Sequence, residues 1–430
     1  MALVNYLTNR SFVLKTLLLL LGAFYLIAGA LPKHGDYWII TNISMAFAVD
    51  PLHFLAGVQG VAFPPTFYAL QGAWLWLGSN LFHYQLAFSR NLSTSTVSSY
   101  TLPDPGILPL WGMIPILAAL FLLVGIAYKE LRNKWLALIC FGPITFVSAI
   151  MMGQIDVVCV FFIFVSLILL QRALKAERYV SLLLLGYLAL GVSTQFKTYG
   201  GLLLPVYAIY TLALLRTRQL DISKSLLTLG SCLAAFLVAT FIVWLPYLGW
   251  FSAIMLHGES NFLLSYSSPL FQVSVWLPGY VAILCYMAVR VFRKPLTSIC
   301  DDRYFVFDNF VIAAWFFIAV QTWPQWWVFL LPPALLVLDN FRTKYGLVFC
   351  ILILITYLFI AMRDMFTSTS GLARVAFFAG YRIPLYIPAL LSTGRWFEWL
   401  FTVLAGLLLF WVFALSKELS DKDAKSSTAT

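Results

Sequence analysis

Polar segments interrupt a largely apolar chain, and several of them hold residue types that could do chemistry. The segment 33-KHGDYW-38 places the carboxylate of Asp36 close to Lys33 and His34. A carboxylate beside a cation and an imidazole could act as a general base, with Asp36 taking the proton. The alternative is an ordinary solvated loop whose lysine extends toward lipid headgroups.

A second segment, 151-MMGQIDVV-158, forms a tight polar turn between two short apolar runs. Gly153 favours the turn, and Gln154 and Asp156 would then point into a cavity below the membrane surface. An acid at this depth is costly, so a functional role is the default interpretation. Asp156 could instead cap the N-terminus of the helix that follows.

The third segment, 193-STQFKTYGGLLLPV-206, contains a lone cation between two apolar runs. Lys197 could bind a phosphate group through charge-assisted hydrogen bonds. It could equally extend to ordinary lipid phosphates.

The fourth segment, 321-QTWPQWWVFLLPP-333, combines three tryptophans with Gln321 and Gln325. Such residues could stack on a sugar ring and bind its hydroxyl groups, or they could form an aromatic belt at the membrane surface. A weaker segment of the same kind is 256-LHGESN-261, with His257 and Glu259.

Composition decides which elements must position these side chains. The chain has 430 residues, of which 62% are hydrophobic and only 10% are charged. No soluble domain of this length could bury so much apolar surface, so the sequence predicts an all-α polytopic membrane protein. The net charge of +10 does not indicate nucleic-acid binding, because the basic residues lie in short connectors between apolar runs.

Apolar runs of about 20 residues, the length that spans a bilayer, follow one another along the chain. The first is too long for a signal-peptide core, and the cysteines suggest neither a disulfide framework nor a metal cluster. We predict about twelve transmembrane helices, at 12–31, 107–127, 135–152, 157–171, 179–195, 200–215, 225–248, 270–290, 305–322, 326–338, 346–362 and 397–415.

The distribution of Lys and Arg predicts the orientation. With the N-terminus in the cytoplasm, that side of the membrane receives 20 of the 27 basic residues. The positive-inside rule therefore places both termini in the cytoplasm. The remaining seven lie outside: Lys33, Arg90, Lys197, Arg363, Arg374, Arg382 and Arg395.

These spans define one transmembrane domain, 1–415, followed by a cytoplasmic tail, 416–430, predicted to be disordered because it is polar and lacks apolar periodicity. Two large outer segments are predicted, 32–106 and 363–396. Within the first, 45–58 and 67–82 are too short or too broken to span, and they resemble amphipathic helices that lie in the interface.

The order and sidedness of these segments resemble the GT-C superfamily of integral-membrane glycosyltransferases, which take a sugar from a polyprenyl-phosphate carrier. The likeness is to the small members that lack a periplasmic domain, such as the bacterial polyprenyl-phosphate-mannose-dependent mannosyltransferases. It extends to the glycolipid-anchor mannosyltransferase and the lipid-linked-oligosaccharide glucosyltransferases. It rests on Asp36 after the first span, the interfacial segments with 62-AFPPTFYAL-70, the turn 153-GQID-156, Lys197 ahead of Pro205, and the late tryptophan-rich segment.

The resemblance implies an inverting transfer of a mannose- or glucose-like hexose to a lipid-linked glycan or protein acceptor outside the cytoplasm. Asp36 would be the base, although Asp50 is an alternative because the family's first loop often carries a second acid. Lys197 or Arg382 would stabilise the leaving phosphate. No cofactor is required, and a divalent metal is known only for some members. The predicted substrate-binding residues are Lys33, His34, Gln154, Asp156, Lys197, His257, Glu259, Gln325 and Arg382.

The main rival interpretation is a transporter or lipid flippase. Transporters often contain inverted repeats with broken helices near the membrane midplane. We see no convincing repeat here, and the polar residues gather toward the outer surface instead. Compact length and the lack of a retention signal favour a bacterial inner membrane over the endoplasmic reticulum.

The predicted topology can be tested with single cysteines introduced by Ser95→Cys and Ser416→Cys. An impermeant thiol reagent added to intact cells should label the first position only, because the 32–106 segment is predicted outside and the tail inside. Labelling at position 416 but not at position 95 would reverse the orientation.

Overall fold

A computed structural model describes most of the chain, and the regular elements of the described part are all helical. The described residues are 10–29, 35–54, 64–83, 86, 108–151, 153–248, 276–293, 302–320, 324–341, 346–367 and 396–427.

Every predicted span overlaps a helix or a run of consecutive helical elements. The first half contains α2 (Arg10–Gly29), α3 (Gly35–Val49), α5 (Pro65–Phe82), α6 (Leu108–Glu130), η2 (Lys134–Phe141), α7 (Pro143–Thr145), η3 (Phe146–Met151), α8 (Asp156–Lys175) and α9 (Tyr179–Thr194). The second half contains η4 (Thr198–Leu203), α10 (Leu204–Thr217), α11 (Ile222–Phe241), η5 (Ile242–Tyr247), α14 (Trp276–Arg293), α16 (Asp302–Ala319), η6 (Pro324–Leu330), α17 (Leu331–Asn340), α18 (Gly346–Thr367) and α21 (Trp396–Ser427).

The protein is a helical membrane protein. Six helical segments of the described chain are long and apolar enough to cross a bilayer. They begin at Ser11, Trp111, Asp156, Thr198, Ile222 and Trp399, while 134–150, 179–194 and 326–340 are apolar but shorter. The predicted third span is not one regular helix, because Gly142 and Pro143 separate a 3-10 segment from a short α-turn that continues as a π-helix.

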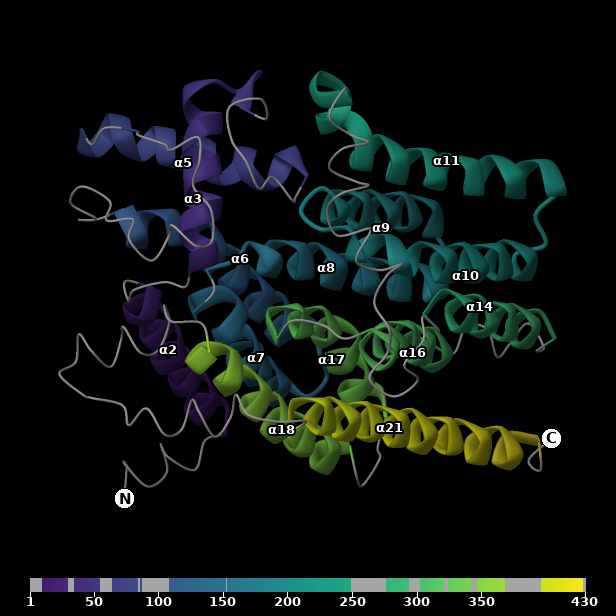
Figure 1. Cartoon of the computed structure of the whole chain (residues 1–430). Coiled ribbons are helices and arrows are strands. Elements are labelled where there is room, and N and C mark those ends of the chain that lie inside the picture. The colour runs from purple at the N-terminus through teal and green to yellow at the C-terminus, as the bar shows by residue number, and fades with distance from the viewer. Residues whose placement is uncertain are drawn as a thin grey trace.

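Helix α8 lies at the centre of the bundle and packs along α9, which in turn packs on α11 (Figure 1). It is apolar around most of its circumference, as expected for a helix that is covered on several sides. The Ser166 hydroxyl donates to the Gly186 carbonyl at 2.6 Å and closes the α8–α9 contact. This core holds the start of α8, which carries Asp156, in a fixed position.

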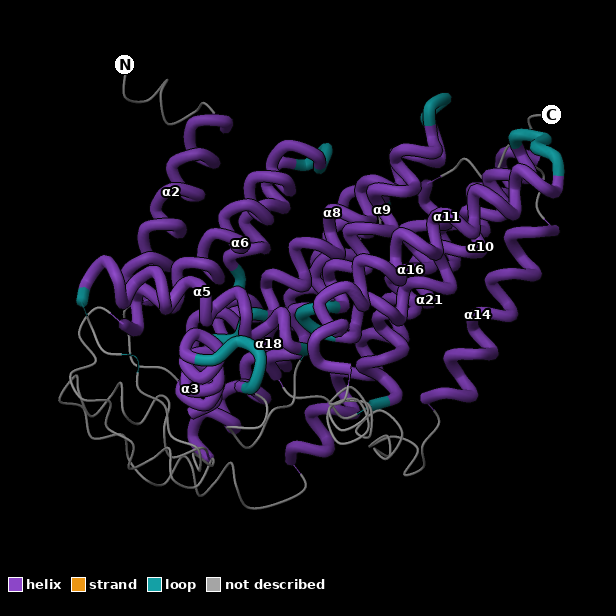
Figure 2. Tube along the Cα trace, turned by 90° about the horizontal axis from the view of Figure 1, so that it is seen from above, coloured by secondary structure: helices purple, strands orange, loops and turns teal. Residues whose placement is uncertain are grey.

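Helix α3 crosses the direction of α8–α11, and α5 packs against it (Figures 1 and 2). The predicted interfacial helix at 45–58 is therefore wrong in its bounds: α3 spans 35–49, and Asp36 lies in its first turn rather than in a loop. The reason is Pro51, which disfavours helical geometry at Asp50 and ends the helix there. The second predicted segment, 67–82, coincides with α5.

The basic connectors gather at one end of the bundle. Backbone amides of Arg132 and Asn133 donate to Asp339, and Arg172 pairs with Glu130. Arg218 reaches the Ala176 carbonyl. Helices α3 and α5 lie toward the opposite end (Figure 2). The bundle therefore has a basic end and an α3–α5 end, whichever way it sits in the membrane.

The predicted disorder of 416–430 is wrong for the described part of the tail, because α21 continues to Ser427. Polar composition misled the prediction. Glu418 and Lys422 are spaced i,i+4, as are Asp421 and Lys425, and such acid-before-base pairs stabilise a helix without an apolar face.

The contact between α3 and α5 yields a stability prediction. A Cβ added at Gly72 would lie 2.6 Å from the Ser44 carbonyl oxygen and 2.9 Å from the Phe47 ring, so α3 would have to move. Gly125, within α6, has open space around the same position. Gly72→Ala should be about 1–3 kcal/mol less stable than Gly125→Ala, the usual cost of overpacking. Thermal unfolding in detergent measures the difference, and equal stability would show that α3 does not pack this closely.

Candidate functional site

A buried ion pair joins two of the polar segments that the sequence singled out. Lys197 Nζ lies 3.1 Å from Asp156 Oδ1, and both side chains are 0% exposed. Removing two charges from water costs several kcal/mol per ion, so such a pair must be held by good geometry and further polar contacts. The structure brings together Asp156 and Lys197, two predicted substrate-binding residues that lie 41 positions apart.

Asp156 does not cap α8. The N-cap position belongs to Ile155, and Asp156 is the first helical residue, with its carboxylate directed at Lys197. A negative charge in the first turn also interacts favourably with the helix dipole. The capping alternative considered for Asp156 is therefore wrong.

Lys197 occupies the extended link between α9 and η4, with φ −154° and ψ 145°. Its amide donates to the Ser193 carbonyl at 3.1 Å, and its own carbonyl accepts from the Cys159 thiol at 3.8 Å. Because the ammonium group is fully buried, it does not extend to the headgroups of surrounding lipid. The alternative of ordinary snorkelling is wrong for this lysine.

The tryptophan-rich segment completes the surroundings of the pair. Lys197 Nζ lies 5.5 Å from the centre of the Trp326 ring, within the range of a cation–π interaction. The Tyr199 ring stacks on Phe329 at 4.1 Å. Trp326 and Trp327 are buried, so these two rings belong to the protein interior and not to an aromatic belt.

The first turn of α3 also contacts the surroundings of the Asp156–Lys197 pair, through the side chain of Tyr37. Gly153 has φ +60°, in the left-handed region that favours glycine, and a Cβ added there would overlap the Tyr37 ring. Tyr37 therefore packs directly on the 153-GQID-156 turn, and its neighbour Asp36 lies at the same level of the bundle. Gln154, in this turn, is buried. Three segments far apart in the sequence thus converge around Asp156 and Lys197.

Polar contacts between α3 and α5 hold this arrangement. The Ser44 hydroxyl donates to Gln71 Oε1 at 3.2 Å, and Gln71 Nε2 donates to the Thr41 hydroxyl at 3.4 Å. All three side chains are buried. Because buried polar groups specify geometry when they are hydrogen-bonded, this contact sets the register of α3 and the position of its first turn.

Sequence reasoning missed two buried hydroxyl groups that precede the turn in the sequence. Thr145 and Ser148 are fully buried, and within the described residues their hydroxyl groups have no hydrogen-bond partner. The Ser148 carbonyl accepts from the Gln154 amide at 3.1 Å, which places the serine next to the turn. Ser148 lies on the π-helix η3, and π-helical turns are frequent at functional sites. The sequence signal that could have identified Thr145 and Ser148 is their position as polar residues inside an apolar run.

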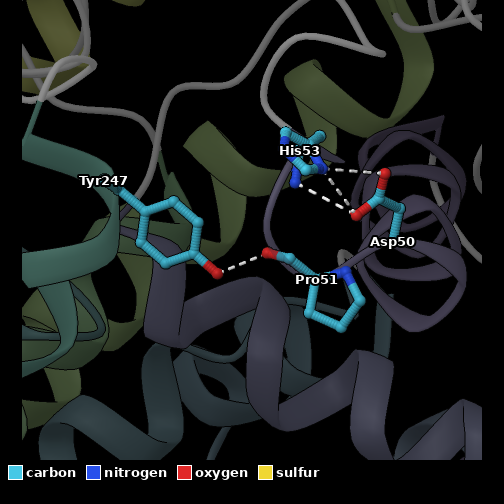
Figure 3. A network of polar contacts seen from close by, with 4 residues as sticks. All are labelled: Asp50, Pro51, His53 and Tyr247. Atoms are coloured by element: carbon cyan, nitrogen blue, oxygen red, sulfur yellow. Dashed lines mark hydrogen bonds and ion pairs between the residues drawn. The ribbon is translucent and has the colours of Figure 1, made fainter.

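The other candidate acid, Asp50, lies at the far end of α3. Both of its carboxylate oxygens are 3.2 Å from His53 Nδ1, and the Tyr247 hydroxyl donates to the Pro51 carbonyl (Figure 3). Asp50 and His53 are exposed. The helical rise of about 1.5 Å per residue puts Asp50 roughly 21 Å along the axis from Asp36. The two aspartates therefore cannot serve the same reacting atom.

Five of the predicted site residues lie outside the described residues: Lys33, His34, His257, Glu259 and Arg382. Asp36 and Gln325 are described by their backbone alone, in α3 and η6. Within the described ranges, no three His, Cys, Asp or Glu side chains gather as a metal site would require.

Comparison with known proteins does not assign a function, so the function is argued from the geometry of the site. The sequence matches no family model, no curated protein and no solved structure. What the arrangement offers is a buried cation beside a carboxylate, polar turn residues and aromatic rings. These groups could bind an anion and a polar ring.

The buried pair predicts a distinctive stability pattern. Lys197→Ala or Asp156→Ala alone should lower the free energy of unfolding by about 3–5 kcal/mol, because each leaves an uncompensated buried charge. The double variant Asp156→Asn with Lys197→Gln removes both charges and should recover most of that loss. Thermal unfolding of the purified variants measures this. Single variants as stable as the wild type would show that the two charges are not buried together.

Proposed function

We propose that this protein is an inverting glycosyltransferase that takes a hexose from a polyprenyl-phosphate carrier. The observation that carries the proposal is the convergence of the α3 start, the 153–156 turn and Trp326 around the Asp156–Lys197 pair. The same segments underlie the resemblance to the GT-C superfamily. Their meeting at one place is what a shared substrate site requires.

Asp36 is the proposed catalytic base. Tyr37 packs on the turn that carries Gln154 and Asp156, so the first turn of α3 adjoins the buried pair. Asp50 is about 21 Å further along the helix, at roughly 1.5 Å per residue, and is directed toward His53. A base must lie within hydrogen-bond reach of the proton that it removes, which favours Asp36.

The proposed reaction is a single displacement. The Asp36 carboxylate takes the proton of the acceptor hydroxyl while that oxygen attacks the anomeric carbon. The bond from this carbon to the phosphate oxygen breaks, and its electron pair leaves with polyprenyl phosphate. Attack from the opposite face inverts the configuration, and Asp36 then passes the proton to water. A retaining double displacement would need a second carboxylate at about 5 Å as the nucleophile.

Lys197 is proposed to stabilise the departing phosphate. An ammonium group has three donors, so a phosphate oxygen can join the Asp156 carboxylate as an acceptor. The carboxylate keeps the cation in place when no donor is bound, which avoids an uncompensated buried charge. Gln154 and the hydroxyl groups of Thr145 and Ser148 are proposed to bind the sugar.

The proposal also includes the finer topology. All twelve predicted spans would cross the membrane, with the basic end in the cytoplasm and the α3–α5 end outside. The host membrane would be a bacterial inner membrane. The acceptor would be a lipid-linked glycan or a protein, reached from the outer face where the carrier phosphate lies.

The base assignment predicts different outcomes for two similar substitutions. Asp36→Asn keeps the size of the side chain but cannot accept a proton, so turnover should fall by about 10²- to 10⁴-fold, the usual contribution of a general base. Asp50→Asn is the matched control at the other end of α3 and should leave turnover near the wild-type value. The assay incubates purified protein with a panel of radiolabelled polyprenyl-phosphate sugars and an extract of acceptors.

Loss of activity in Asp50→Asn with normal turnover in Asp36→Asn would show that the wrong aspartate is named. Normal turnover in both variants would reject the single-base mechanism. Movement of the intact labelled lipid across the membrane, without sugar transfer, would instead favour a flippase.

A further inference from the structure

A second site lies among α14, α16 and α21, away from the Asp156–Lys197 pair. A cavity of about 700 Å³ is lined there by apolar side chains, including Ile283, Met287, Val311 and Leu409. Its volume is within the range of ligand pockets, which combine apolar walls with a few polar groups. Tyr286, Phe410 and Phe413 also line it and are more than half exposed, so the cavity opens at the side of the bundle.

The cavity has a rigid polar end. Arg290 pairs with the buried carboxylate of Asp308, which also accepts a 2.8 Å hydrogen bond from the Tyr210 hydroxyl. The Arg290 guanidinium lies 5.1 Å from the centre of the Tyr304 ring. These contacts fix α14 against α16 and α10, and they hold one cation at the boundary of the cavity.

Further basic residues lie one helical turn from residues that line the cavity. Arg293 is three positions beyond Arg290, Arg303 four before Phe307, and Lys417 four beyond Phe413, so each shares a helix face with a lining residue. Arg216 donates to the Phe292 carbonyl and joins them. The ring centres of Phe310 and Trp411 are 4.7 Å apart, which sets the middle of α16 beside α21. The described side chains near this end thus include four further basic residues, Arg216, Arg293, Arg303 and Lys417, and two acidic ones on α21, Glu418 and Asp421.

We infer that this cavity binds an anionic phospholipid, with an acyl chain between α14, α16 and α21 and the phosphate at the basic end. Basic pockets between membrane helices are typical sites for anionic headgroups. The basic end is the end opposite α3 (Figure 2), and Tyr37 of α3 packs on the 153–156 turn, so the bound lipid is not the proposed sugar donor. The inference does not depend on the glycosyltransferase proposal.

Gly406 allows the chain-binding part to be tested. It lines the cavity, and a Cβ added there would meet no atom within 4 Å. Gly406→Phe should therefore fill the cavity without a clash, and Gly406→Leu should fill it partly. Gly230, on the exposed surface of α11, has the same open surroundings, so Gly230→Phe is the matched control.

The experiment reconstitutes each purified variant into nanodiscs with equal amounts of phosphatidylglycerol and phosphatidylcholine, and then counts retained lipids by native mass spectrometry. Wild type and Gly230→Phe should retain phosphatidylglycerol, Gly406→Leu less of it, and Gly406→Phe none. Arg293→Gln and Lys417→Gln should each weaken retention about fivefold, since one basic residue contributes roughly 1 kcal/mol at an anionic surface. Lys224 lies outside the cavity at the same end of the bundle, so Lys224→Gln should leave the retention of phosphatidylglycerol unchanged.

Three outcomes would overturn the inference. One is equal retention by Gly406→Phe and Gly230→Phe, and another is equal retention of the two phospholipids by the wild type. The third is retention of added polyprenyl phosphate in preference to phosphatidylglycerol by the wild type but not by Gly406→Phe, which would assign the cavity to the carrier lipid. Size-exclusion chromatography confirms that each compared variant is folded.

Discussion

The Asp156–Lys197 ion pair is the constraint on which the rest of the site depends. Both charges are fully buried, and neither could remain so without the other. The pair fixes the start of α8 against the α9–η4 link. Trp326 then covers the cation, and Tyr37 packs against the turn that precedes the acid.

The site is therefore assembled from elements that are far apart in the sequence. Helix α8 supplies the acid, the α9–η4 link supplies the cation, and η6 supplies the aromatic ring. Helix α3 reaches this group by lying across the other helices, held to α5 by the Ser44–Gln71–Thr41 hydrogen bonds. This arrangement depends on Gly153, because a side chain at this position would displace Tyr37.

The sequence predicted the helices well where length and apolarity decide them, as in α2, α6 and α11. The prediction of helix ends failed where single residues or pairs of side chains decide them. Pro51 ends the helix of the first outer segment, which therefore spans 35–49. Acid–base pairs at i,i+4 spacing stabilise the continuation of α21 through the predicted tail. The site was predictable as a set of residue types, since Asp156 and Lys197 were both singled out. Their pairing was not, because only tertiary packing brings together residues 41 positions apart, and the same holds for Trp326.

We propose that sugar leaves a polyprenyl phosphate at the Asp156–Lys197 site with inversion. The most direct measurement follows a donor labelled at the anomeric carbon by NMR, comparing the wild type with the charge-free variant Asp156→Asn with Lys197→Gln. We expect the wild type to release polyprenyl phosphate and form product of inverted configuration, and the folded charge-free variant to leave the donor intact. Product of retained configuration, or equal turnover by the charge-free variant, would contradict the account.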